Sequence, residues 1–131
     1  MGIIIDTSAI IAVITNEPHK QKLLNLSNGH ELIAPRSIVW EIGNAFSAML
    51  KQKRITMEQS LKCINIYEKI PMRMVEVDIR IALEIANRLN IYAYDAYLIA
   101  CAHKYKFPLL TLDKGLSLAA QNDQIQLLEV E

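Results

Sequence analysis

The sequence has only two cysteines, no net charge and no long hydrophobic run, and each of these absences excludes a class of protein. Cys63 and Cys101 lie alone on helical patterns without a Cys-x-x-Cys or Cys/His pairing, which argues against a zinc site and a disulfide framework. The zero formal charge gives no global sign of a nucleic-acid binder, so any affinity for phosphates must be local. The apolar run from Ala9 to Ile14 is far too short to span a bilayer, and no signal peptide is evident. We therefore expect a cytoplasmic protein without a membrane contact.

The chain does have enough apolar material for one folded domain. Its 131 residues are 52% hydrophobic and 21% charged, a composition typical of a globular chain that buries a sizeable core. No linker, internal repeat or low-complexity tract interrupts it. We predict a single domain over residues 1–131.

Short β-branched or leucine-rich runs alternate with longer helical segments, which predicts βαβ units and a mostly parallel sheet of the α/β class. Runs such as Ile3–Ile5 lack strict alternation, as expected for strands covered by helices on both faces. The predicted strands are Gly2–Ile5, Glu31–Ala34, Arg73–Val77, Phe107–Leu112 and Ile125–Val130.

Local signals set the predicted helix boundaries. Pro18 fits a first helical position, and Ser27-Asn28-Gly29 supplies a left-handed residue that ends that helix. Thr56 and Gln59 have the spacing of a capping box, and Pro71 stops the helix that follows.

Four carboxylates, far apart in the sequence, lie in apolar neighbourhoods where a charge is costly. They are Asp6, Glu41, Asp95 and Asp113, in the contexts IIIDTSAI, IVWEIGNAF, YDAYLIACA and LLTLDKGL. Asp6 directly follows the first predicted strand, and Asp113 ends a later one. Because the carboxyl ends of parallel strands share one edge of the sheet, where ligands bind, we expect these groups to meet there.

Asp95 and Glu41 are predicted to reach the same edge from helices. Asp95 begins a helix whose inner face continues as Leu98 and Ile99, so its carboxylate is aimed inward. Glu41 lies inside a helix that Pro35 is predicted to open, about 80° from the centre of the apolar stripe at about 100° per residue. That stripe consists of Ile38, Ile42, Ala45, Phe46 and Met49.

The aspartates also have a simpler interpretation, because Asp is a favoured helix N-cap. Asp6, Asp78, Asp95 and Asp113 each precede or begin a helical pattern, so any one of them taken singly fits capping. Asp78 carries no special signature, and we assign it to capping alone.

A cluster of the four carboxylates would require a cation. At roughly 5 Å, each close pair would repel by about 3 kcal/mol at an effective dielectric near 20. An all-oxygen ligand set with open positions suits Mg²⁺ or Mn²⁺ better than zinc, and such an ion hydrolyses phosphodiesters with a metal-bound water. We predict that Asp6 and Asp95 contact the metal and that Glu41 and Asp113 complete the shell or orient the water.

Hydroxyl and amide side chains near these acids are candidates for the hydrogen bonds that hold metal-bound carboxylates, although they fit helix starts equally well. These candidates are Thr7, Ser8, Asn44 and Thr111. The three histidines are scattered, which gives little support to an imidazole site.

At these residues the sequence closely resembles the PIN domain, specifically the VapC-type toxins of bacterial and archaeal toxin–antitoxin pairs. The resemblance covers essentially the whole chain: IIIDTSAI, the Pro35 to Glu41 spacing with Asn44 behind it, YDAYLIA and TLDKGL. It implies a three-layer α/β/α sandwich, a Mg²⁺- or Mn²⁺-dependent endoribonuclease site, homodimerisation, and inhibition by a cognate antitoxin. The four acids occupy the family's acidic positions; the Thr-Ser pair after Asp6 stands where many relatives have Thr-Asn.

The side chains that contact RNA are harder to identify. Basic candidates are the cluster Lys51, Lys53 and Arg54, and, near the expected acidic edge, Arg36, Lys104, Lys106 and Lys114. The cluster fits a solvated helix end equally well. Tyr92, Tyr94 and Tyr97 are suited to base stacking, packing or a dimer surface.

Three rival functions share some of these features. A haloacid-dehalogenase-type phosphotransferase needs a second aspartate where Ser8 stands, and a response-regulator receiver needs paired acids there. The non-enzymatic rival is a catalytically inactive PIN-like module for RNA binding or protein interaction, which predicts no stabilisation by metal.

Overall fold

The computed structural model describes residues 1–15 and 18–129, and its centre is a four-stranded sheet whose neighbouring strands all pair in parallel. The strands are β1 (Gly2–Ile5), β2 (Glu31–Pro35), β3 (Arg73–Val75) and β4 (Leu109–Leu110). Their order is β3-β2-β1-β4, so β1 lies between β2 and the last strand. The direction of winding therefore reverses at β1, which makes the β1/β4 boundary the topological switch point of the sheet.

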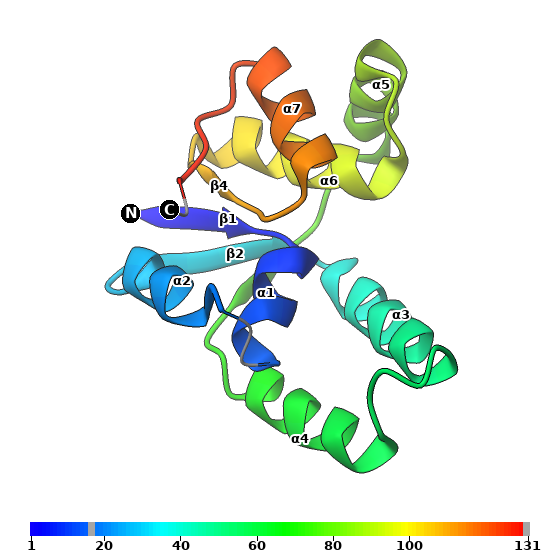
Figure 1. Cartoon of the computed structure of the whole chain (residues 1–131). Helices are drawn as coiled ribbons and strands as arrows, with labels where there is room; N and C mark the ends of the chain where they lie inside the picture. The colour runs from blue at the N-terminus through cyan, green and yellow to red at the C-terminus, as the bar shows by residue number, and fades with distance from the viewer. Residues whose placement is uncertain (16–17, 130–131) are drawn as a thin grey trace.

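Helices cover both faces of the sheet (Figure 1). They are α1 (Thr7–Ile14), α2 (Lys20–Ser27), α3 (Ile38–Lys51), α4 (Met57–Glu68), α5 (Ile79–Leu89), α6 (Ala93–Tyr105) and α7 (Lys114–Asn122). Ile4 of β1 packs into the core formed with α5, α6 and α7, whereas Ile3 and Ile5 pack into the core formed with α1, α2 and α3. This alternation of one strand between two cores confirms the predicted three-layer sandwich.

Several predicted boundaries follow from local chemistry. Thr56 and Gln59 form the capping box of α4, which ends at Glu68, before Pro71. Gly29 has a φ of +79° just beyond the end of α2, a conformation that favours glycine. The predicted stripe of α3 also faces the core, where Ile38, Ile42 and Phe46 are buried.

Two proline assignments were wrong by two or three residues. Pro35 is the last residue of β2 rather than the start of a helix, and α3 begins at Ile38. Proline has no N–H to donate, and here the N–H of Arg36 makes the bond to the Val75 carbonyl. Pro18 likewise precedes α2, which begins at Lys20.

The predicted strand at Ile125–Val130 was also wrong. Leu127 forms a single parallel bridge with Leu109, flanked by hydrogen bonds from Leu109 N to Gln126 O and from Leu128 N to Leu109 O; Val130 lies outside the described residues. The neighbouring strand β4 itself pairs regularly with β1 over only two residues, Leu109 and Leu110. The single bridge between Leu109 and Leu127 is too short to make the C-terminal segment a fifth strand of the sheet. Within the described residues no helix is long and apolar enough to cross a membrane.

Candidate metal centre

The four predicted carboxylates line one cavity of about 390 Å³ at the carboxyl edge of the sheet. Asp6 comes from the end of β1, Glu41 from α3, Asp95 from α6 and Asp113 from the loop between β4 and α7. The starts of α1 and α3 lie beside each other at this edge (Figure 1). The structure therefore places all four carboxylates around one cavity.

Asp6 is the most buried of the four, with 4% of its surface exposed. Its carboxylate accepts hydrogen bonds from Ser8 Oγ at 2.8 and 2.9 Å, from the Ala9 N–H at 3.0 Å, and from Thr111 Oγ1. Burial nevertheless raises the pKa of Asp6 above its ordinary value, and the nearby charge of Asp113 adds to the rise. A buried carboxylate held by three groups is fixed in place but remains costly to ionise.

The same two hydroxyls tie β1 to the loop that carries Asp113. Ser8 Oγ accepts from the Leu112 N–H at 2.9 Å, and Thr111 Oγ1 accepts from the Asp113 N–H at 3.0 Å. Asp113 itself is exposed and caps α7, accepting from the Leu116 N–H at 3.0 Å. Ser8 and Thr111, two of the predicted supporting residues, thus connect Asp6 at the end of β1 to the loop that follows β4.

Glu41 lies in the first turn of α3 and accepts a hydrogen bond from Ser37 Oγ at 3.2 Å. Burial, and secondarily the charges of Asp6 and Asp95, raise its pKa to about 7, against the lowering effect of Ser37 and Thr7. Near neutral pH this side chain is therefore poised between its two protonation states.

Asp95 lies in the first turn of α6, which begins two residues earlier than predicted, and it does not occupy the cap position. Its helix neighbours Leu98 and Ile99 are buried as expected. Burial raises the pKa of Asp95, and the nearby Asp113 raises it further. Asp95 is thus half-buried beside a like charge, although an acid in the first turn also complements the helix dipole.

The donor set fits a hard divalent cation. The residues lining the cavity include four carboxylates but no lysine, arginine or histidine, and the charges of the acids act on one another's pKa values. The buried Oγ1 of Thr7 makes no hydrogen bond within the described residues, although its side chain is close enough to Glu41 to lower that pKa. Among residues 1–15 and 18–129 no three His, Cys, Asp or Glu side chains are gathered closely enough to hold one ion, so direct ligation requires side-chain movement or bridging water.

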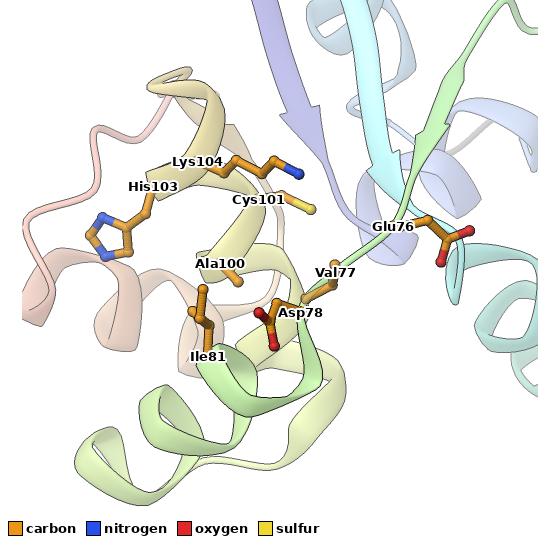
Figure 2. A pocket seen from close by; sticks show the side chains of 8 residues that line it. All are labelled: Glu76, Val77, Asp78, Ile81, Ala100, Cys101, His103 and Lys104. Atoms are coloured by element: carbon orange, nitrogen blue, oxygen red, sulfur yellow. The ribbon is translucent and has the colours of Figure 1, made fainter.

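The other predicted residues separate into those at the cavity and those away from it. Asn44 is exposed on α3 and does not line the cavity. Asp78 caps α5, accepting from the Arg80 N–H at 2.9 Å, and lines a different cavity of about 440 Å³ next to α6 (Figure 2). Its assignment to capping agrees with that position.

The basic candidates also divide. Lys114 follows Asp113 directly, and Arg36 follows the end of β2. Lys104 and Lys106 were placed wrongly near the acidic edge: they lie in the last turn and at the C-cap of α6, at the opposite end of the helix from Asp95. The Lys51–Arg54 cluster begins at the end of α3, about 15 Å along the axis from Glu41 at about 1.5 Å per residue.

Sequence reasoning missed Trp40, which stands next to Glu41 and is 65% exposed. The signal was available: Ile38, Ile42 and Ala45 define the core face of α3, and a residue two positions after Ile38 points away from that face.

The parallel sheet extends in both directions from β1, and four carboxylates line one cavity at its switch point; this is an α/β fold with its polar site at the edge where such folds bind ligands. The sequence model of the PIN domain matches residues 3–122, and the chain belongs to this family. PIN domains are typically nucleases and generally use divalent metals.

Two solved structures share the fold. The crystal structure of PAE2754 from Pyrobaculum aerophilum has a TM-score of 0.71 and 19% identity, covering 91% of this chain and 79% of that one. That of Mycobacterium tuberculosis VapC20, a sarcin-ricin loop cleaving toxin, has a TM-score of 0.64 and 16% identity, covering 90% of this chain and 95% of that one. No curated protein matches this chain.

Proposed function

We propose that this chain is a Mg²⁺- or Mn²⁺-dependent endoribonuclease and the toxin component of a toxin–antitoxin pair. The observation that carries the proposal is the cavity at the switch point, where Asp6, Glu41, Asp95 and Asp113 meet with no basic side chain among the lining residues. Such a concentration of like charge is a poor structural device and a good cation site.

The chemistry is hydrolysis of an RNA phosphodiester by water. When bound, the ion lowers the pKa of a water molecule and offsets the charge that develops on the phosphate. Asp6 and Asp95 would hold the ion, and the hydrogen bonds from Ser8 and Thr111 keep Asp6 oriented. Glu41, whose side chain lines the cavity, would orient the attacking water and accept its proton. Asp113, on the loop after β4, would complete the ligand set.

Cleavage of a labelled RNA by the purified chain tests this proposal. We expect products in Mg²⁺ or Mn²⁺, no products in EDTA, and no products with Asp6→Asn. Asp78→Asn is the matched control, because Asp78 is also a helix-capping aspartate but lines a different cavity. Full cleavage by Asp6→Asn would remove Asp6 from the site.

The chemistry of the product ends is an independent test. Attack by water leaves a 5′-phosphate, whereas attack by the ribose 2′-hydroxyl leaves a cyclic phosphate. Products that carry only cyclic phosphate ends would contradict the proposed mechanism.

The toxin role is tested in cells. Expression of the chain should arrest growth, and co-expression of its cognate antitoxin, encoded by the neighbouring gene, should relieve the arrest. Cells that express the Asp6→Asn variant should grow normally without the antitoxin. Growth arrest by Asp6→Asn as strong as that of the wild type would separate toxicity from cleavage.

The alternative is a catalytically inactive PIN-like module whose acids only cap helices or bind a partner. A metal that binds only the folded chain stabilises it by mass action and so raises its melting temperature. At a metal concentration 100 times the dissociation constant, the gain in stability is about 2.7 kcal/mol. We expect such a rise with Mg²⁺ or Mn²⁺, and an unchanged melting temperature favours the alternative.

A further inference from the structure

The sheet has an open edge at β3. At the other edge Leu109 of β4 forms the bridge to Leu127, whereas no described residue pairs with the outer side of β3. Val75 accepts a hydrogen bond from the Arg36 N–H, so its backbone faces β2, and successive residues of a strand turn their backbone groups to opposite sides. The N–H and C=O of Met74 therefore point away from the sheet, where a further strand can pair with them.

A cavity of about 440 Å³ lies beside this edge, on the face of the sheet that α5 and α6 cover (Figure 2). Its apolar lining comes mainly from Ile81 of α5 and from Ala100 and Cys101 of α6, and the segment that follows β3 directly forms another wall. Burial raises the pKa of the Cys101 thiol to about 11, so this group is neutral at physiological pH. Ile81 nevertheless remains 54% exposed, which leaves apolar surface uncovered next to unpaired backbone.

A strand added to β3 would send every second side chain toward this cavity. Val75 packs into the core formed with α5, α6 and α7, and Val77 packs against the same core. Arg73 lies over the ring of Tyr105 on α6. Alternate residues of β3 thus face α6, and in an added strand alternate residues face the same way.

The cavity has opposite charges at its two ends. Lys104 lies near the start of β3, because its Nζ is 5.4 Å from the centroid of the Tyr105 ring and Cζ of Arg73 is 5.2 Å from the same centroid. Asp78 lies beyond the end of β3, where its Oδ1 accepts from the Arg80 N–H (Figure 2). Within the described chain neither Lys104 nor Asp78 forms an ion pair. Both charges can therefore pair with groups of a ligand.

We infer that the outer edge of β3 and the adjoining cavity dock an extended segment of another protein, which carries an acidic, an apolar and a basic residue at alternate positions. These three side chains reach Lys104, the cavity and Asp78 in turn. Backbone hydrogen bonds to Met74 supply affinity, and the cavity and the two charges supply the sequence preference.

A protected sheet edge is the simpler account of the same strand. Short strands and charged residues keep sheet edges from pairing with other chains, and β3 has only three residues. This account leaves the exposed Ile81 and the order of the charges unexplained, and it predicts that no peptide binds.

Two synthetic peptides of identical composition distinguish these accounts. The patterned peptide, acetyl-Thr-Glu-Val-Leu-Val-Arg-Thr-amide, places its Glu, Leu and Arg on one face of an extended strand, whereas the control, acetyl-Thr-Val-Glu-Leu-Arg-Val-Thr-amide, places both charges on the face opposite Leu. Each is made in both chain directions, because the charge order does not fix the direction of pairing. By calorimetry we expect the patterned peptide, in one direction, to bind about tenfold more tightly than either control. Equal binding of all the peptides, or binding of none, overturns the inference.

Amide hydrogen exchange, followed by NMR, locates the contact. The Met74 N–H should become protected when the patterned peptide binds, whereas the Val75 N–H, which faces β2, should be protected with and without the peptide. Binding that leaves Met74 unprotected would contradict pairing at this edge.

Two variants test the backbone and the charge separately. Met74→Pro removes only the outward N–H, which an edge strand tolerates, and should weaken binding about 3- to 10-fold, whereas Met74→Val keeps the N–H and should bind normally. Circular dichroism checks that both fold. Lys104→Glu should weaken binding of the patterned peptide, and replacing the peptide's Glu by Lys should restore it. Full binding by Met74→Pro, or no restoration with Lys104→Glu, refutes the corresponding contact.

The remaining outcomes separate this inference from a dimer and from the nuclease proposal. If the wild type binds no peptide and Met74→Pro converts a dimer to a monomer, the edge belongs to a second copy of the chain and the inference fails. A wild type that cleaves RNA but binds no peptide refutes this inference alone. A wild type that binds the patterned peptide with protection of Met74 but cleaves no RNA supports it and refutes the nuclease proposal alone.

Discussion

Asp6 has two opposing effects on the stability of the chain. Its Oδ1 accepts from the Ala9 N–H and so caps α1, a contact that stabilises the helix start. Its burial and the charge of Asp113 raise its pKa, which means that ionised Asp6 costs stability. The hydroxyls of Ser8 and Thr111 offset part of that cost, and they orient the carboxylate at the same time.

Asp95 is expected to contribute to chemistry at the expense of stability. In Asp95→Asn the repulsion with Asp113 is removed while the size of the side chain is kept. We expect RNA cleavage to be lost and the free energy of unfolding in EDTA to stay the same or rise, as measured by urea denaturation. Wild-type cleavage by this variant, or a marked loss of its stability without metal, would show that Asp95 is a structural residue.

Glu41 should make the metal-free protein less stable as the pH rises. Its pKa is raised from 4.5 to about 7, so between these values the folded chain binds more protons than the unfolded chain. The stability contribution is therefore fully present below pH 4.5 and is lost as the pH rises through 7. Thermal unfolding in EDTA across this range should show the decline, and Glu41→Gln should flatten it. Glu58→Gln, at an exposed ion pair on α4, should leave the decline intact.

At the scale of elements, three helices on one face of the sheet are tied together by a single carboxylate. Asp123, the C-cap of α7, accepts hydrogen bonds from Arg88 of α5 and lies 2.6 Å from Nε2 of His103 on α6. Arg88, and less strongly His103, hold the pKa of Asp123 below its ordinary value of 3.8. This contact fixes the far end of the helix that Asp113 begins.

We expect Asp123→Asn to destabilise the chain by at most about 1 kcal/mol at neutral pH, because the ionised acceptor shared by two partly exposed side chains, Arg88 and His103, is lost. A lowered pKa contributes stability above the unfolded value of 3.8 that is lost as the pH falls through the folded value. The difference in the free energy of unfolding between the wild type and Asp123→Asn should therefore become smaller at acid pH, as measured by urea denaturation. A difference that stays constant with pH would mean that charge is not its source.

The sequence predicted most elements because each has a local physical signal. The capping box of α4, Gly29 after α2, and the stripe of α3 are all readable within a few residues. The failures depended on distant partners. Whether Ile125–Val130 forms a strand depends on its pairing with β4, which is more than ten residues away in the sequence and pairs with this segment through a single bridge, Leu109 to Leu127.

The candidate site was predictable for a similar reason. The ends of parallel strands meet at one edge, so the positions of Asp6 and Asp113 after strands were enough to place them together. The raised pKa of Glu41 and the cavity beside the edge of β3 were not readable, because both depend on which side chains from other elements surround them.

At the scale of the whole molecule, homodimerisation stays a prediction, and α5 offers an apolar surface for it. Ile79 and Leu83 lie four residues apart on one side of this helix and are 53% and 56% exposed, and Leu83 does not line the acidic cavity. Isolated exposed residues are ordinary, but a charge at the centre of a protein interface is costly.

We expect Leu83→Asp to convert a dimer to a folded monomer, as measured by sedimentation velocity with circular dichroism as the check on folding. Trp40→Ala should remain a dimer. A wild-type chain that sediments as a monomer over the whole accessible concentration range would remove the dimer from the proposal.

The double role of Asp6 has a genetic consequence. In a selection for cells that survive expression of the active chain, a random change at Asp6 removes a helix cap as well as the chemistry, and so yields less folded protein. Changes at Asp95 remove a repulsive charge and leave the helix cap of α1 untouched. Survivors that still accumulate soluble protein, and still sequester the antitoxin, should therefore map to Asp95 more often than to Asp6.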